Sequence, residues 1–275
     1  MSPMRQIKTS KITQTIKDLL LKANYELNAD VLKALRKAYR AETSSIAKKI
    51  LGQILENVRI ARKDKLPICQ DTGLVTVFLE IGQDVHITGG SIEASVNQAV
   101  RTAYLDLRKS VLDGPLSRKN TGDNTPAIIH TKIIPGNKIK IGVMAKGGGA
   151  ENSSALKMFL PTASKEDIIK FVVGLVKEKG ANACPPLIIG VGMGGNFNRS
   201  AYLAKLSLRK KIGKSGPLER EILNKVNQTG LGPMGLGGKT TALAVHILTE
   251  PCHIASLPVA VNLECHAHRY KEAVL

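Results

Sequence analysis

Three cysteines at turns constrain this chain more than any other feature of its sequence. Cys69 lies between Pro67 and Gly73, Cys184 precedes two prolines, and Cys265 begins a Cys-His-Ala-His segment. They lie far apart in the chain, so no local motif links them. Three thiolates presented at backbone corners suggest a metal centre with an incomplete protein shell. An iron–sulfur cube held by three cysteines leaves one iron open, which points to Lewis-acid chemistry rather than electron transfer.

Length and composition predict a protein with a large aliphatic core. The chain has 275 residues, of which 43% are hydrophobic and only 3% aromatic. It contains no apolar run long enough to span a membrane, and its first residues lack the apolar region of a signal peptide. Four cysteines in a chain of this size do not make a disulfide framework. We therefore expect a cytoplasmic, reducing environment, where cysteines more often bind metals or catalyse reactions.

The net charge raises the question of nucleic-acid binding. Forty Lys and Arg residues against 22 Asp and Glu residues give a formal charge of +18. The basic residues are spread over the whole chain, and few aromatic residues accompany them that could stack on bases. We therefore expect neither a nucleic-acid partner nor a membrane. The basic surface is interpreted as solvated, or as a guide for an acidic partner or an anionic substrate.

The pattern of apolar residues predicts mixed helices and strands. Residues 9–65 are expected to be helical, and Ser164 with Asp167 predicts a capping box for a further helix. Because helices and strands do not alternate strictly, the sequence predicts an α/β or α+β fold, with one domain over residues 1–275. The other expected elements are a strand at 74–81, a helix at 91–112, a hairpin over 128–144 with its turn at 135–137, strands at 187–191, 241–249 and 257–263, and helices at 201–209 and 218–228.

Two glycine-rich segments predict different kinds of structure. Lys146-Gly147-Gly148-Gly149 follows an expected strand, and its exposed N–H groups favour an anion site. The segment 190–195 matches the dinucleotide fingerprint G-x-G-x-x-G, but no acidic residue follows where the ribose partner belongs. We interpret it as a turn for close helix–strand packing, and keep nucleotide binding as an alternative.

The histidines beside two cysteines leave a zinc alternative open. Cys252-His253 and the segment 265–268 together offer five potential ligands for a structural zinc ion. The paired C-x2-C spacing of zinc knuckles is missing. Zinc is therefore the second interpretation of this region.

Five segments, in order along the chain, resemble the iron–sulfur hydro-lyases, which are the class I fumarases and L-tartrate dehydratases. The resemblance covers roughly residues 10–270. It implies the fold type of the class I fumarase N-terminal domain and the separate alpha subunit of a two-subunit enzyme, with a beta subunit as partner. The segments are Pro67-Ile68-Cys69-Gln70-Asp71-Thr72-Gly73, Lys146-Gly147-Gly148-Gly149, Ala183-Cys184-Pro185-Pro186, Gly230-Leu231-Gly232-Pro233-Met234-Gly235-Leu236-Gly237-Gly238 and His253-Ile254-Ala255-Ser256-Leu257-Pro258.

The resemblance also implies the site residues and the reaction. A [4Fe-4S] cluster is expected on Cys69, Cys184 and Cys265, but not on Cys252. Because Lys146 stands in the form that resembles fumarases, the expected reaction is interconversion of malate and fumarate, as in the tricarboxylic acid cycle. The alternative is an L-tartrate dehydratase alpha subunit. Asp71 and His253 are expected to be catalytic, with the proton-abstracting base supplied by the beta subunit. The expected substrate contacts are Gln70, Asp71, Arg108, Gly148, Gly149 and His253.

Overall fold

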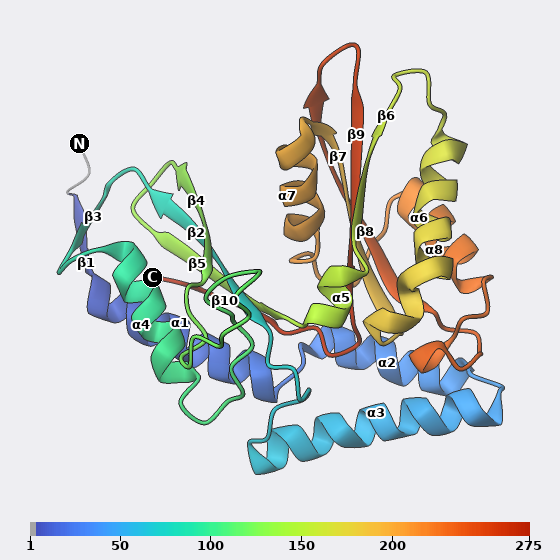
Figure 1. The fold of residues 1–275 in the computed structure, drawn as a ribbon, viewed down its shortest axis with the longest axis horizontal. Helices are drawn as coiled ribbons and strands as arrows, with labels where there is room; N and C mark the ends of the chain where they lie inside the picture. The colour runs from blue at the N-terminus through green and yellow to red at the C-terminus, as the bar shows by residue number, and fades with distance from the viewer. Residues whose placement is uncertain (1–3) are drawn as a thin grey trace. The chain divides into compact units, whose positions relative to one another are not determined.

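A computed structural model describes residues 4–275, which form two compact units (Figure 1). Unit 1 comprises residues 4–28, 58–148 and 269–275, and unit 2 comprises residues 29–57 and 149–268. We expected one domain over the whole chain, and whether the two units form that single domain stays a prediction. No helix in the described part of the chain is both long and apolar enough to cross a lipid bilayer.

The expected helical segment near the N-terminus is present as three helices. They are α1 (Thr9–Tyr25), α2 (Ala29–Ala41) and α3 (Ser45–Asp64). The mixture of helices and strands in the rest of the chain confirms the predicted α/β class. The remaining helices are α4 (Ile92–Ala103), α5 (Gly148–Asn152), α6 (Lys165–Lys179), α7 (Phe197–Ser207) and α8 (Pro217–Asn227), with 3₁₀ turns at Gly180–Ala183 and Pro233–Gly235.

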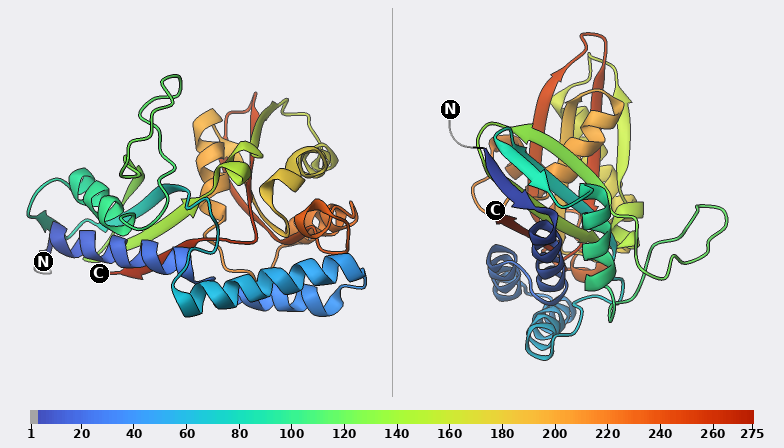
Figure 2. Two further views of the ribbon diagram at one scale, coloured as in Figure 1. Left: turned by 60° about the horizontal axis from the view of Figure 1, so that its bottom comes forward. Right: turned by 90° about the vertical axis from the view of Figure 1, so that its left-hand side faces the viewer.

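Unit 1 contains a four-stranded sheet with the strand order β10-β5-β2-β4. Helices α1 and α4 lie side by side and pack on it, and apolar residues of both helices and of β2 and β5 form one core (Figure 2). A separate parallel pair joins β1 to β3. The strands of this unit are β1 (Arg5–Lys8), β2 (Leu74–Gly82), β3 (Val85–Thr88), β4 (Ile128–Ile134), β5 (Ile139–Lys146) and β10 (Tyr270–Val274).

The hairpin expected over residues 128–144 is wrong in its pairing. Both strands form, but β2 lies between them, parallel to β4 and antiparallel to β5. The turn after β4 crosses the end of β2, where the Gly82 N–H donates to the carbonyl of Lys138 at 2.9 Å. A Cβ on Gly82 would lie 2.2 Å from the carbonyl oxygen of Gly136, so only glycine permits this crossing. The expected helix 91–112 also ends early, at Ala103, and residues 104–127 form a loop that extends from the unit (Figure 2).

Unit 2 contains a second four-stranded sheet with the order β6-β9-β7-β8. Helices α6 and α8 share an apolar core with its strands, and α7 packs on the other face (Figure 1). The capping box predicted from Ser164 and Asp167 is present at the start of α6. The strands are β6 (Ala155–Phe159), β7 (Leu187–Gly195), β8 (Ala242–Cys252) and β9 (Leu257–Glu264).

The dinucleotide-like glycines lie within β7 rather than in a turn. A Cβ added to Gly190 would lie 2.2 Å from the carbonyl oxygen of Ala204, and one added to Gly192 would lie 2.1 Å from that of Ser200. Both carbonyls belong to α7, so these glycines serve close helix–strand packing, as the sequence predicted. Because the segment is an extended strand covered by a helix, it does not form the phosphate-binding turn that a nucleotide site needs.

Candidate active site

The Cys69 loop in unit 1 is fixed by hydrogen bonds on both sides of the cysteine. The backbone N–H of Ile68 donates to the carbonyl of Asn24 at 2.8 Å. The Tyr104 hydroxyl donates to the carbonyl of Thr72 at 2.8 Å, and the Thr72 hydroxyl donates to the carbonyl of Arg108. Cys69 itself is partly exposed. The loop therefore presents one thiol on a backbone that is held in place.

The Asp71 carboxylate accepts three hydrogen bonds, and its backbone carbonyl accepts a fourth. Its Oδ1 accepts from the Gly73 N–H at 3.0 Å and from the Ser110 hydroxyl at 3.1 Å, while its Oδ2 accepts from the Gly148 N–H at 2.7 Å. The carbonyl of Asp71 accepts from Nη1 of Arg269. Two of the predicted substrate contacts, Asp71 and Gly148, are thus brought together by a bond between residues 77 positions apart.

Buried polar residues adjoin the backbone of the Cys69 loop. Tyr104 is fully buried, and burial raises its pKa to about 12 against a smaller, opposing effect of Arg269. It therefore remains a neutral hydroxyl donor at physiological pH. Arg269 is 1% exposed, and Lys146 is also buried. Sequence reasoning missed Arg269, because its distance along the chain from Asp71 gives no local signal.

The other predicted substrate contacts in unit 1 are exposed. Gln70 and Arg108 present their side chains to solvent. The Cys69 Sγ lies 3.5 Å from Oε1 of Gln70. Arg108 is tied to the Cys69 loop through its backbone carbonyl, so its guanidinium stays available to an anion.

In unit 2, His266 links the backbone corner of Cys265, which it follows, to that of Cys184. A ring nitrogen of His266 lies 2.8 Å from the carbonyl oxygen of Cys184, 82 positions away. The backbone N–H of His266 also approaches this carbonyl, at 3.4 Å. Burial lowers the pKa of His266, against the opposing effect of its contact with Cys184. Cys184 and Cys265 thus sit on adjoining backbone corners.

The Cys184 corner has an uncommon backbone. Cys184 has φ of 54°, in the left-handed region, and follows the 3₁₀ turn at 180–183. The Met234 N–H donates to the carbonyl of Pro185 at 2.9 Å, so the glycine-rich segment 230–238 supports this corner. Gly149 also packs against the corner, since a Cβ on it would lie 2.7 Å from the carbonyl of Asn182. A non-glycine residue at positive φ is uncommon, and such strain concentrates at functional sites.

Cys265 is buried at the end of β9, with its Sγ 3.5 Å from Oε1 of Glu264. Cys252 ends β8 and His253 begins the exposed turn that follows, at the opposite end of β9 from Cys265. Eight residues of extended strand span roughly 25 Å, so within unit 2 this turn is remote from Cys184 and Cys265. His253 bonds locally, accepting at its Nδ1 from the Ala255 N–H at 3.1 Å. The zinc interpretation therefore loses its geometric basis, because its ligands lie at two ends of a strand.

The donor chemistry of these corners fits an iron–sulfur cluster better than a hard cation. Each of the three loops presents a thiol, and none of the four cysteines forms a disulfide. Over residues 4–275, no group of three or more His, Cys, Asp and Glu side chains is arranged to hold a single metal ion.

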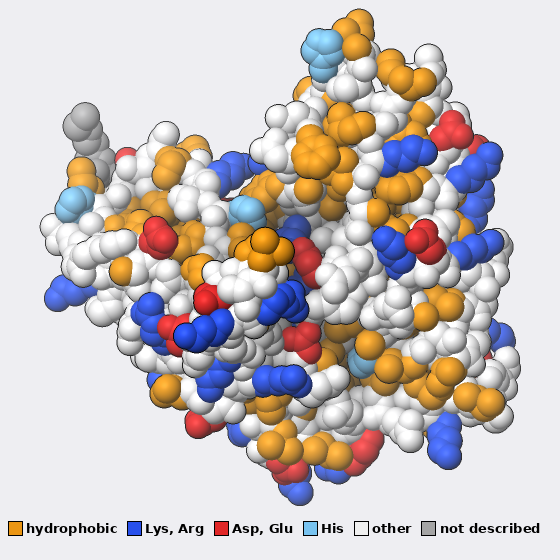
Figure 3. Space-filling model, viewed as in Figure 1, with side chains coloured by type: hydrophobic (Ala, Val, Ile, Leu, Met, Phe, Trp, Pro, Cys, Tyr) orange, Lys and Arg blue, Asp and Glu red, His pale blue; other side chains and the backbone are white. Residues whose placement is uncertain are grey.

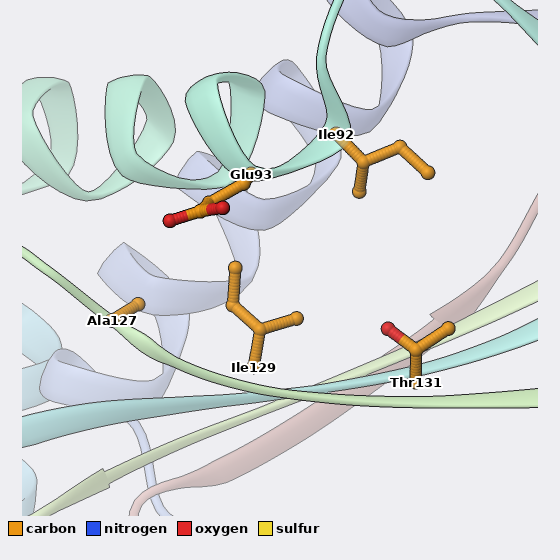
Figure 4. Close-up of a pocket in the computed structure, with 5 residues that line it drawn as sticks. All are labelled: Ile92, Glu93, Ala127, Ile129 and Thr131. Atoms are coloured by element: carbon orange, nitrogen blue, oxygen red, sulfur yellow. The ribbon is translucent and has the colours of Figure 1, made fainter.

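A cavity elsewhere in unit 1 does not suit a dicarboxylate. It has a volume of about 430 Å³ and lies between the start of α4 and β4 (Figure 4). Its lining residues are Ile92, Glu93, Ala127, Ile129 and Thr131. The only charged group among them is a carboxylate, which repels anions. None of the predicted site residues lines it.

The basic side chains do not form one patch on the face that Figure 3 shows. Lys and Arg are scattered there among acidic and apolar side chains. Several lysines are paired, including Lys205 with Glu151 at 2.8 Å and Lys210 with Glu219 at 2.9 Å. This dispersal supports the interpretation of the charge as a solvated surface.

Comparison with known proteins gives a family match over almost the whole chain. The model of the family described as fumarate hydratase (Fumerase) matches residues 13–274. A protein of Methanocaldococcus jannaschii named "Putative L(+)-tartrate dehydratase subunit alpha" is 39% identical over 273 residues, covering 94% of this chain and 95% of the relative. The L(+)-tartrate dehydratase subunit alpha of Escherichia coli O157:H7 is 29% identical over 276 residues, covering 96% of this chain and 91% of the relative.

Proposed function

The chain belongs to the fumarate hydratase (Fumerase) family of hydro-lyases, and on that premise we propose that it is the alpha subunit of a two-subunit dehydratase. Its substrate is a four-carbon hydroxydicarboxylate and its partner is a beta subunit, in the cytoplasm. The observation that carries the proposal is the bond between Asp71 and Gly148. It joins the carboxylate beside Cys69 to the glycine segment that the sequence predicted as an anion site.

We propose that Cys69, Cys184 and Cys265 hold a [4Fe-4S] cluster. When bound, such a cluster supplies Lewis acidity that polarises a substrate hydroxyl. The support is the sequence resemblance of all three loops together with the joined corners of Cys184 and Cys265 in unit 2. Cys252 has no part in the proposal, because β9 separates it from Cys265.

Asp71 is proposed to contact the substrate through its remaining acceptor capacity. An ionised carboxylate has about four lone-pair sites. Three donors already bind it, from Gly73, Ser110 and Gly148. One site remains for a hydroxyl or a transferred proton. The exposed side chains of Gln70 and Arg108 supply donors for the substrate carboxylates. The base that removes the C–H proton is proposed to come from the beta subunit.

L-tartrate has better support as the substrate than malate. The relatives that match over nearly their full length are named L(+)-tartrate dehydratase alpha subunits. The fumarase expectation rested on Lys146, which is buried at the end of β5. A buried lysine there is poorly placed to choose between substrates directly. Malate is therefore the second candidate.

His253 remains a predicted substrate contact, on the condition that it reaches a site outside its own unit 2. Because β9 separates His253 from Cys265 in unit 2, we propose that it acts at the site of another chain in the assembly. Its exposure in the turn between β8 and β9 leaves it accessible to such a neighbour.

The test is co-expression of this chain with its beta subunit, purification without oxygen and cluster reconstitution. Iron and acid-labile sulfide are measured per chain, and kcat/KM is compared for L-tartrate, malate and fumarate. We expect a higher kcat/KM for L-tartrate, and loss of activity when the beta subunit is left out. Zinc in place of iron and sulfide, or full activity from the alpha chain alone, would contradict the proposal.

A further inference from the structure

Arg269 occupies an uncommon place for an arginine. It is 1% exposed, and it precedes the last strand of unit 1, β10. Its backbone carbonyl accepts from the Ala145 N–H at 3.1 Å, which fixes the residue beside β5. Its Nη1 donates to the carbonyl of Asp71. A fully buried guanidinium is costly unless charges and hydrogen bonds compensate it, so its contacts must account for its presence.

Part of the Arg269 guanidinium lies beside the segment Lys146-Gly147-Gly148-Gly149. Among residues 4–275, Nε and Nη2 of Arg269 have no hydrogen-bond partner. A Cβ added to Gly147 would lie 3.1 Å from Oδ2 of Asp71 and 3.4 Å from Nη2 of Arg269. The bare Cα of Gly147 therefore has the Asp71 carboxylate and the Arg269 guanidinium as neighbours. Opposite charges on either side of one glycine attract each other, and more strongly where burial excludes water, as it does at Arg269.

We propose that Arg269 is the positioning residue of Asp71. This inference rests on the proposed function, in which Asp71 contacts the substrate. Arg269 holds the Asp71 backbone by its carbonyl and attracts its carboxylate across Gly147. The carboxylate is thereby kept on the Gly148 N–H, with its free acceptor site in a fixed direction. Gly147 belongs to this arrangement, because a Cβ there would crowd Oδ2 of Asp71 and touch Nη2 of Arg269.

Four variants test the inference in the alpha–beta complex. Arg269→Gln removes the positive charge and some of the N–H donors of the guanidinium. Arg269→Lys keeps the positive charge but lacks the planar set of guanidinium donors. Gly147→Ala keeps Arg269 but crowds the gap. Gly174→Ala is the matched control, because its added Cβ meets nothing within 4 Å.

Two readouts distinguish positioning from mere structural support. The first is kcat and KM per cluster, with cluster content measured by iron and sulfide. Misplacing a catalytic group by about 1 Å costs on the order of 100-fold in rate. We expect Arg269→Gln to lower kcat by about that factor with little change in KM. Arg269→Lys and Gly147→Ala should be intermediate, and Gly174→Ala should match the wild type.

The second readout is hydrogen exchange of the Gly73 and Gly148 amides, which bind the Asp71 carboxylate. It needs neither cluster nor activity. We expect faster exchange of both amides in Arg269→Gln and Gly147→Ala, and unchanged exchange in Gly174→Ala. If Arg269→Gln fails to fold, Arg269→Lys and Gly147→Ala decide the outcome. Wild-type kcat per cluster and wild-type exchange in these variants would overturn the inference. If the wild-type complex dehydrates no dicarboxylate, the proposed function fails, while the exchange data still decide whether Arg269 holds Asp71.

Discussion

The Cys69 loop and the Cys252 turn both combine a cysteine with a polar residue, but their supports differ. Asp71 follows Cys69 by two positions, and His253 directly follows Cys252. The Cys69 loop is held by bonds to residues far along the chain, including Arg269 and Gly148. The Cys252 turn is exposed, and His253 bonds to a residue two positions away. A reactive residue is positioned more precisely when residues far along the chain bond to the loop that carries it. The Cys69 loop has such support, whereas the Cys252 turn would need another molecule to position His253.

The sharpest test of this contrast is the removal of each thiol. Cys69→Ser, Cys184→Ser and Cys265→Ser should each lose nearly all of the cluster, because each removes one of the thiolates proposed to hold it. Cys252→Ser should keep it. Iron and acid-labile sulfide per chain after anaerobic reconstitution measure this effect. Cluster loss in Cys252→Ser with retention in Cys265→Ser would reverse our assignment of the third ligand.

Asp71 and His253 should differ in which chain they serve. Asp71→Asn should lower kcat by about 100-fold or more with the cluster retained, the range typical of a positioned acid–base group. Asp113→Asn, on the exposed 104–127 loop, is the control. His253→Ala should also lose rate.

If His253 acts on a neighbouring chain, co-assembly of the Asp71→Asn and His253→Ala chains should recover part of the rate. Each mixed assembly then contains a site with both groups intact. Activity of purified mixed complexes, carrying different affinity tags, measures this recovery. No recovery would place His253 and Asp71 in the same chain's site, or His253 outside the chemistry.

The two units should respond to opposite ends of the pH scale. In unit 2, burial lowers the pKa of His246 to about 4 from 6.5. Its folded pKa is depressed, so its contribution to stability is present above pH 6.5 and is lost as pH falls to about 4. In unit 1, the pKa of Tyr104 is raised to about 12 from 10, so its contribution is present below pH 10 and is lost as pH rises to about 12. Each change amounts to about 3 kcal/mol in the free energy of unfolding.

Hydrogen exchange at several pH values separates these effects by unit. His246→Gln should flatten the acid response of unit 2, and Tyr104→Phe should flatten the alkaline response of unit 1. Equal acid sensitivity of His246→Gln and wild type would show that other groups in unit 2 govern the response.

The smallest expected effect comes from a single bond to Asp71. Ser110→Ala removes one of its three carboxylate donors. A hydrogen bond of this kind is worth about 0.5–1.5 kcal/mol, so kcat should fall by roughly 2- to 12-fold. Ser117→Ala, in the same loop but bonded to Asp113, is the control. A loss as large as that of Asp71→Asn would mean that Ser110 has its own contact with the substrate.

The sequence by itself determined the local features of this protein. Apolar spacing predicted the N-terminal helices, the Ser164 capping box predicted the start of α6, and the cysteine loops predicted the family that the comparison then matched. These signals are local, because helix periodicity, caps and turns depend on residues a few positions apart.

Only the tertiary structure decided the strand order and the surroundings of Asp71. The insertion of β2 between β4 and β5 reverses what the turn at 135–137 predicted, because pairing depends on which distant strand fills the gap. The contact of Arg269 with Asp71 joins residues 198 positions apart. A single sequence carries no periodicity that relates such residues, since their meeting is fixed by the packing of the whole unit. The position of the Asp71 carboxylate is therefore a property of the fold, even though the sequence motif around Cys69 already singled out this residue.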